Sequence, residues 1–162
     1  MHTEEHTWYI EISNRPGVVD AVGDGICGDI ADLGISGVGG VRFVRLYLLC
    51  GALSEADAQN AATRLLADPV TQDYRVGPDG RLRAKSGQWG IEVWLRPGVT
   101  DATSETTLKG IRDLGLLGIA HAATGRGYVL SGDIAPETVN AICRRLLAND
   151  VIEQYRYYPG TA

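Results

Sequence analysis

Arg15-Pro16-Gly17-Val18, followed by Asp20-Ala21, recurs 81 residues later as Arg96-Pro97-Gly98-Val99, followed by Asp101-Ala102. The same offset, without a gap, relates the stretches before and after this motif. Between residues 8 and 76, 25 of the 69 aligned positions are identical in the second copy, about 36%. Self-similarity at a fixed period is the signature of a duplicated structural unit. The sequence therefore predicts a chain built from two copies of one module.

The duplication divides the 162 residues into three parts. Residues 1–76 form the first repeat, residues 77–88 a polar linker, and residues 89–162 the second repeat. A unit of this size is marginal as an independent fold, because it buries too little apolar surface. Two fused copies can bury a shared face, so we expect them to pack as a pseudo-dimer.

Hydrophobic periodicity predicts the same order of elements in each copy. Residues 8–14 and 90–95 alternate like strands and end before a proline. Asp20 and Asp101 stand where a helix N-cap belongs, and Gly34 and Gly115 where a C′ glycine belongs. Second helices begin near Ser54 and Pro136, and final strands are expected at residues 70–76 and 151–158.

The middle of each repeat is rich in strand-forming residues. In the second copy, Gly125-Arg126-Gly127 predicts a hairpin between residues 117–123 and 127–131. In the first copy, residues 41–50 form either one long strand or a hairpin bent at Gly39-Gly40. The order β-α-β-β-α-β predicts an α+β fold, with two ferredoxin-like repeats and an antiparallel sheet that carries helices on one face.

Composition limits the classes of partner. Lys plus Arg number 15 and Asp plus Glu number 20, which gives a net charge of −5. An acidic chain is poorly suited to phosphate contacts, so we expect no nucleic acid and no membrane as partners. The polar residues 1–7 do not resemble a signal peptide, and we expect a cytoplasmic location. Cys27, Cys50 and Cys143 lack zinc spacing and are expected to be small core residues.

No catalytic constellation is visible. His2 and His6 lie near the N-terminus, and His121 lies in an expected strand without a positioned partner. Gly37-Val38-Gly39-Gly40 precedes a strand and is interpreted as a turn rather than a phosphate-binding loop. We therefore predict no catalytic residue, no cofactor and no metal in this chain, and favour a binding or assembly role over an enzyme.

Arginine and tyrosine residues are the candidates for partner contacts. Both are favoured in the centres of protein interfaces. In the last strand, alternation puts Tyr155 on one face and Arg156 with Tyr158 on the other. Sheet packing and a protein interface remain equally open for that second face. Arg15 and Arg96 lie in strand-to-helix turns that are either structural or docking loops.

The segment Arg144-Arg145-Leu146-Leu147-Ala148-Asn149-Asp150-Val151-Ile152-Glu153-Gln154-Tyr155-Arg156-Tyr157 resembles the C-terminal signature of the PurS family. Residues 64–75 of the first copy are a weaker version of it. Residues 15–20 with Gly23 resemble the early motif of the family, with Ala21 in place of its second proline. Gly125-Arg126 is similar to the Gly-Lys pair that precedes the central strand of the family.

The resemblance implies a function in purine biosynthesis. PurS is the small subunit of phosphoribosylformylglycinamidine synthase, and its units pair as dimers, which this chain resembles in covalent form. The family has no active site. It bridges a synthetase (PurL-type) subunit, which uses ATP and magnesium, and a glutamine amidotransferase (PurQ-type) subunit, so that ammonia passes between them. Partner-binding roles for Arg15, Arg96, Arg126, Tyr155, Arg156 and Tyr158 follow as expectations, and self-association remains open.

A second resemblance leaves an alternative function. Residues 14–19 and 32–35 are similar to the strand–turn–helix opening of ACT regulatory domains, which bind small amino acids at a dimer interface. ACT domains are also ferredoxin-like, so fold alone does not separate the two families. The Tyr-Arg-Tyr ending favours PurS. A subunit of a related synthetase that acts on another substrate is a further alternative.

Overall fold

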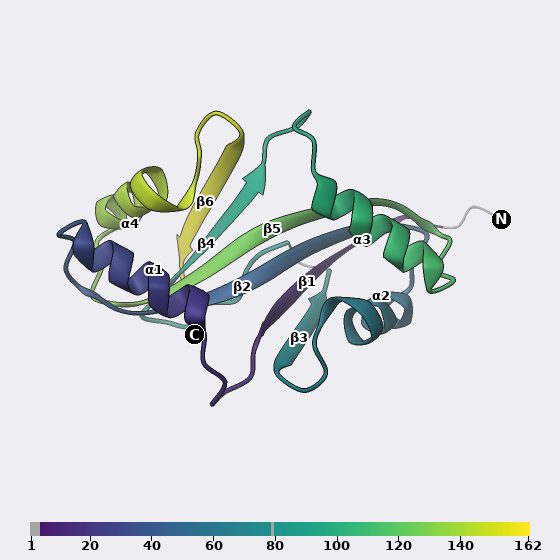
Figure 1. The fold of residues 1–162 in the computed structure, drawn as a ribbon, viewed down its shortest axis with the longest axis horizontal. Coiled ribbons are helices and arrows are strands. Elements are labelled where there is room, and N and C mark those ends of the chain that lie inside the picture. The colour runs from purple at the N-terminus through teal and green to yellow at the C-terminus, as the bar shows by residue number, and fades with distance from the viewer. Residues whose placement is uncertain (1–3, 79) are drawn as a thin grey trace. The chain divides into compact units, whose positions relative to one another are not determined.

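The computed structural model describes residues 4–78 and 80–162. Helices and strands alternate in each half of the chain (Figure 1). The elements of the first half are β1 (His6–Asn14), α1 (Ala21–Asp32), β2 (Val38–Gly51), α2 (Glu55–Ala61), the π-helical turn η1 (Ala62–Leu66) and β3 (Gln72–Gly77). Those of the second half are β4 (Gln88–Leu95), α3 (Ala102–Asp113), β5 (Ile119–Gly132), α4 (Pro136–Ile142), the π-helical turn η2 (Cys143–Leu147) and β6 (Glu153–Pro159).

The strands form a six-stranded sheet in the order β3-β1-β2-β5-β4-β6. β1 pairs antiparallel with β2 and β3, and β4 pairs antiparallel with β5 and β6. The predicted α+β class and antiparallel sheet are confirmed. The cap predictions also hold, because Asp20 and Asp101 accept a backbone N–H of the first turn of α1 and α3. Gly34 and Gly115 have positive φ angles of 79° and 91° directly after these helices.

The predicted hairpin at Gly125-Arg126-Gly127 is wrong, because β5 runs unbroken from Ile119 to Gly132. Gly125 lies opposite Trp94 of β4, and a Cβ atom there would come within 2.6 Å of the indole ring. The glycine thus makes room for a cross-strand aromatic ring instead of turning the chain. β2 is likewise one long strand, and it includes Val38 to Gly40 of the predicted turn, so that only Gly37 with φ 94° lies outside it.

The chain forms two compact units that differ from the sequence repeats. Unit 1 comprises residues 1–18, 45–81 and 100–124, and unit 2 comprises residues 19–44, 82–99 and 125–162. Each long strand, β2 and β5, contributes one half to each unit. Helix α1 of the first repeat therefore belongs to unit 2, and α3 of the second repeat belongs to unit 1.

The core of unit 1 lies between the sheet and the helices α2 and α3. Ile10 and Ile12 of β1 and Leu49 of β2 point to the same side, where they meet Leu66 of η1 and Ile111 of α3. Ile111 comes from the second repeat and is fully buried in this cluster. Burying an isoleucine side chain contributes about 1.5–3 kcal/mol, so α3 adds substantially to the stability of unit 1.

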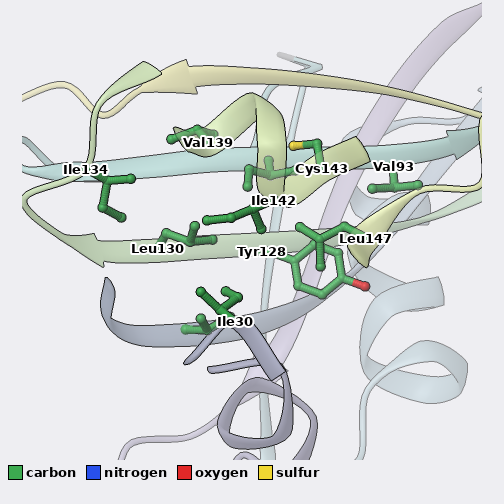
Figure 2. Close-up of a cluster of buried hydrophobic side chains, with 11 residues drawn as sticks. Ile30, Val93, Tyr128, Leu130, Ile134, Val139, Ile142, Cys143 and Leu147 are labelled. Atoms are coloured by element: carbon green, nitrogen blue, oxygen red, sulfur yellow. The ribbon is translucent and has the colours of Figure 1, made fainter. Parts of the chain in front are cut away.

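The core of unit 2 has the same construction with the repeats exchanged. Figure 2 shows Ile30 of α1 in one cluster with Leu130 of β5 and with Val139 and Ile142 of α4. Ile30 is 1% exposed and occupies the position that corresponds to Ile111. In both units the two helices lie on one face of the strands, as predicted, but one of them comes from each repeat rather than both from the same repeat.

The connection between the repeats is ordered where the structure describes it. Leu82 and Ala84 of the predicted linker are buried, and both belong to unit 2. The Thr161 N–H donates to the Ala84 carbonyl at 3.1 Å, and the Gly160 N–H donates to the Gln88 carbonyl at 2.7 Å. Asp79 lies outside the described residues. Residues 82–88, which we call the connector, are thus fixed to the end of β6 rather than serving as a loose tether.

Candidate interaction surface

Glu92 is the centre of a polar cluster on the face of unit 2 that carries no helix. Alternation along β4 places Ile91 and Val93 in the core and Glu92 on the opposite face. Its carboxylate is fully buried. Oε2 accepts from Arg156 Nε at 2.7 Å and from the Tyr158 hydroxyl at 2.6 Å. A buried carboxylate with such partners is stabilised, whereas loss of a partner would leave an uncompensated charge.

Tyr158 connects this cluster to the connector. Its hydroxyl donates to Glu92 and accepts the backbone N–H of Leu82 at 2.6 Å. Its ring lies over Gly90 of the neighbouring strand, where a Cβ atom would come within 2.8 Å of the ring. Burial and the Glu92 carboxylate raise the pKa of Tyr158 well above its usual value, so the hydroxyl stays a donor. Tyr158 therefore packs on this face, and Arg156, whose side chain is 52% exposed, pairs with Glu92 there.

Arg126 caps the C-terminal end of η2, which continues helix α4. Its Nη2 donates to the Leu147 carbonyl at 2.8 Å, and its Nη1 lies 2.8 Å from Glu153 Oε2. The last carbonyls of a helix lack partners inside the helix, and a guanidinium satisfies one of them here. Arg45 does the same in the first repeat, with Nη2 3.0 Å from the Leu66 carbonyl. The Gly-Lys-like position thus has a structural role in both copies.

Arg15 and Arg96 hold the loop that precedes each edge strand. Arg15 donates from Nη2 to the Pro69 carbonyl at 2.9 Å, and it forms an ion pair with Asp73 at 3.2 Å. Arg96 donates from Nε to the Asp150 carbonyl at 3.0 Å. We call residues 68–71 and 149–152 the edge loops. Each is fixed to the Arg-Pro-Gly turn of its own repeat by these side chains.

Tyr155 points to the helical side of the sheet. Its hydroxyl donates to Asn140 Oδ1 at 2.7 Å, and its ring stacks on Tyr157 at a centroid distance of 6.4 Å. Of the six candidate residues, only Arg156 and Tyr158 meet, at Glu92. All six make contacts within their own unit, and their part in partner binding stays a prediction.

Two glutamates that were not among the predicted site residues organise the face of the sheet that carries no helix. Glu11 pairs with Arg75 in unit 1 as Glu92 pairs with Arg156 in unit 2. The signal was present, since the Ile-Glu pair recurs at the 81-residue offset inside an alternating strand. A charged residue kept in both copies on a strand flanked by core residues indicates a buried partner.

A hollow of about 410 Å³ lies beside Arg15 in unit 1. It is also lined by Thr63, Ala67, Pro69, Gln72, Asp73 and Tyr74. Because Arg15 is paired with Asp73 and bonded to loop carbonyls, the hollow offers no unpaired guanidinium to a ligand.

Within residues 4–78 and 80–162, no three His, Cys, Asp or Glu side chains gather closely enough to hold a metal ion. In the same residues, no helix is long and apolar enough to cross a bilayer. His121 is exposed on β5, and His2 lies outside the described residues. Cys143 is buried, which raises its thiol pKa to about 12, while Cys27 and Cys50 are half-buried.

Comparison with known proteins identifies the family. The model of the PurS family, described as phosphoribosylformylglycinamidine (FGAM) synthase, matches twice, at residues 7–78 and 88–159. No curated protein matches the chain. Among solved structures, the chain is similar to PurS of Methanocaldococcus jannaschii, with 22% identity and a TM-score of 0.42. That match covers 46% of this chain and 96% of the other. The two family matches together span most of the sequence, and the chain is a member of the PurS family that carries two family units in tandem.

Proposed function

We propose that this chain is a non-catalytic subunit of phosphoribosylformylglycinamidine synthase in purine biosynthesis. It bridges the synthetase and glutaminase subunits, so that ammonia released from glutamine reaches the synthetase without escaping to solvent. The observation that carries the proposal is the match of the PurS family to both repeats. The structure of the M. jannaschii relative is described as one subunit of formylglycinamide ribonucleotide amidotransferase.

The contacts within each compact unit suit a preorganised binding surface. Its arginines and tyrosines fix loops and helix ends, as Arg126 does at Leu147 and Arg96 does at Asp150. A preorganised surface loses less conformational entropy when it binds a partner. In the proposed complex, ATP and magnesium bind to the synthetase subunit, and assembly takes place in the cytoplasm.

Reconstitution tests this function. The purified chain is mixed with the synthetase and glutaminase subunits of the same organism, and amidine formation is assayed with glutamine and, separately, with ammonia. We expect glutamine-driven turnover to require the chain, because it depends on contact between the two other subunits. Ammonia-driven turnover should depend on the chain much less.

The control is the same pair of subunits with an equal concentration of an unrelated small protein. If neither rate changes and no complex forms on a sizing column, the proposal is wrong. Binding of an amino acid to the chain, measured by calorimetry, would then point to the regulatory-domain alternative.

A further inference from the structure

The two edge loops each present one exposed valine. Val70 is 77% exposed and Val151 is 81% exposed, and they occupy the same position in the two repeats. Other strongly exposed aliphatic residues are not kept in this way. Val19 corresponds to Thr100, and Leu117 corresponds to Ser36. Among the described residues, Val70 and Val151 are the one large apolar pair that is identical and exposed in both copies.

Neither valine belongs to the buried core of its unit. Most identities between the repeats have a structural explanation, as with the core residues Ile30 and Ile111 or the capping residues Asp20 and Asp101. A side chain that is more than three-quarters exposed contributes little to folding. Scattered surface apolar residues need no explanation, but one that is retained through duplication while its neighbours diverged does.

Both loops hold the valine in a fixed position. Asp68 Oδ1 accepts the N–H of Val70 at 2.8 Å and that of Thr71 at 3.1 Å. Asn149 Oδ1 accepts the N–H of Val151 at 3.1 Å. The arginine contacts to Pro69 and Asp150 fix the same loops from the other side. The side chains are therefore presented on rigid turns, which lowers the entropy cost of docking.

Each loop also carries a carboxylate close to its valine. Asp68 stands two residues before Val70, and Asp150 stands directly before Val151, and both are exposed. The backbone N–H groups of Val70 and Thr71 lower the pKa of Asp68, so it is charged at neutral pH. A surface that receives such a loop needs an apolar recess with a cationic side chain on its rim.

We propose that Val70 and Val151 are a pair of docking knobs, each of which enters an apolar recess with a basic rim on a partner subunit. The inference rests on the proposed function, because it takes the partners to be the synthetase and glutaminase subunits. It adds the residues through which the chain binds them. The duplication supplies two equivalent knobs, one in each compact unit.

The test measures binding of four variants to each purified subunit by surface plasmon resonance. Val70→Ser and Val151→Ser remove the knobs, whereas Val19→Ser and Leu117→Ser are matched controls with similar exposure and a polar residue at the equivalent position of the other repeat. We expect at least one knob variant to bind a subunit about tenfold more weakly, with both controls unchanged. All four should melt at the temperature of the wild-type chain, because each side chain is exposed.

A second pair of variants tests the basic rim. Asp68→Asn and Asp150→Asn remove one charge while keeping the size of the side chain, and asparagine already occupies the equivalent of Asp68 at position 149. We expect these variants to weaken binding about two- to threefold at low salt and to differ less from wild type as salt increases.

The outcomes separate the two proposals. If the wild-type chain binds the subunits and the knob variants bind as tightly as the controls, the docking inference is overturned and the bridging function stands. If the wild-type chain binds neither subunit, both fail.

Discussion

Each compact unit has a buried tyrosine on the face of its strands that carries no helix, but the two tyrosines come from strands that are not equivalent in the two repeats. In unit 1, Tyr9 of β1 pairs across the strands with Gly77 of β3. In unit 2 the order is reversed, since Gly90 of β4 pairs with Tyr158 of β6. Both tyrosines are buried. Each unit therefore has one buried tyrosine in this cross-strand pair with glycine, and the strand that supplies the tyrosine differs between the units.

The exchange explains where the connector lies. Tyr158 is on an edge strand, and its hydroxyl reaches the backbone N–H of Leu82. A tyrosine at the position of Gly90 would leave β6 without this contact. This difference between the repeats therefore provides an anchor for the segment that joins them.

The largest effects should come from Ile30 and Ile111. Ile30 of the first repeat lies in the core of unit 2, and Ile111 of the second repeat lies in the core of unit 1. Ile30→Ala and Ile111→Ala each remove a fully buried side chain and leave a cavity. We expect each to lower the free energy of unfolding by about 2–5 kcal/mol. Urea denaturation followed by circular dichroism measures this. Val22→Ala, on the exposed side of α1, is the control and should change stability little.

A smaller loss of stability should follow when the contact between Tyr158 and the connector is removed. Tyr158→Phe keeps the ring over Gly90 and removes the hydroxyl between Glu92 and Leu82. Because both buried groups lose a hydrogen bond, we expect a loss of about 1–3 kcal/mol in unfolding free energy. Hydrogen exchange should increase at Leu82 and Ala84. Tyr74→Phe, at a partly exposed ring of unit 1, is the control, and an equal loss in both variants would contradict the anchoring role.

The smallest effect should come from the helix caps, which also differ between the units. Ser54 forms a capping box with Asp57 at the start of α2, whereas Ala135 makes no side-chain cap at the start of α4. We expect Ser54→Ala to cost about 1 kcal/mol and Ala135→Ser to gain up to about 1 kcal/mol. Thermal denaturation of the two variants checks this, and changes of the same sign would contradict it.

The elements of each repeat could be predicted because their signals are local. Asp20 and Asp101 as N-caps and Gly34 and Gly115 after the helices follow from short-range chemistry. The continuous strand β5 could not be predicted at Gly125, since the ring that fills its space belongs to Trp94 on another strand. A glycine signals a turn or a close approach, and only the tertiary structure decides between them.

The sequence also could not predict which compact unit each of the helices α1 and α3 joins. Ile30 and Ile111 are identical and lie at the same place on α1 and α3. Either helix would present the same apolar face to either core, so periodicity alone does not decide which unit receives it. The candidate site was predicted only in part. The arginines and tyrosines were found from their residue types, but their partners Glu92, Glu153 and Asn140 are far from them in sequence.

The central claim is that α1 of the first repeat belongs to unit 2 and α3 of the second repeat belongs to unit 1. Hydrogen exchange of the two isoleucine variants tests this claim most directly. Local opening reports which segments share a cooperative core. Ile30→Ala should increase exchange in residues 88–95 and 136–159 of the second repeat more than in β1 and β3. Ile111→Ala should do the reverse. If each substitution instead loosens mainly the strands of its own repeat, the exchange of helices between the units is contradicted.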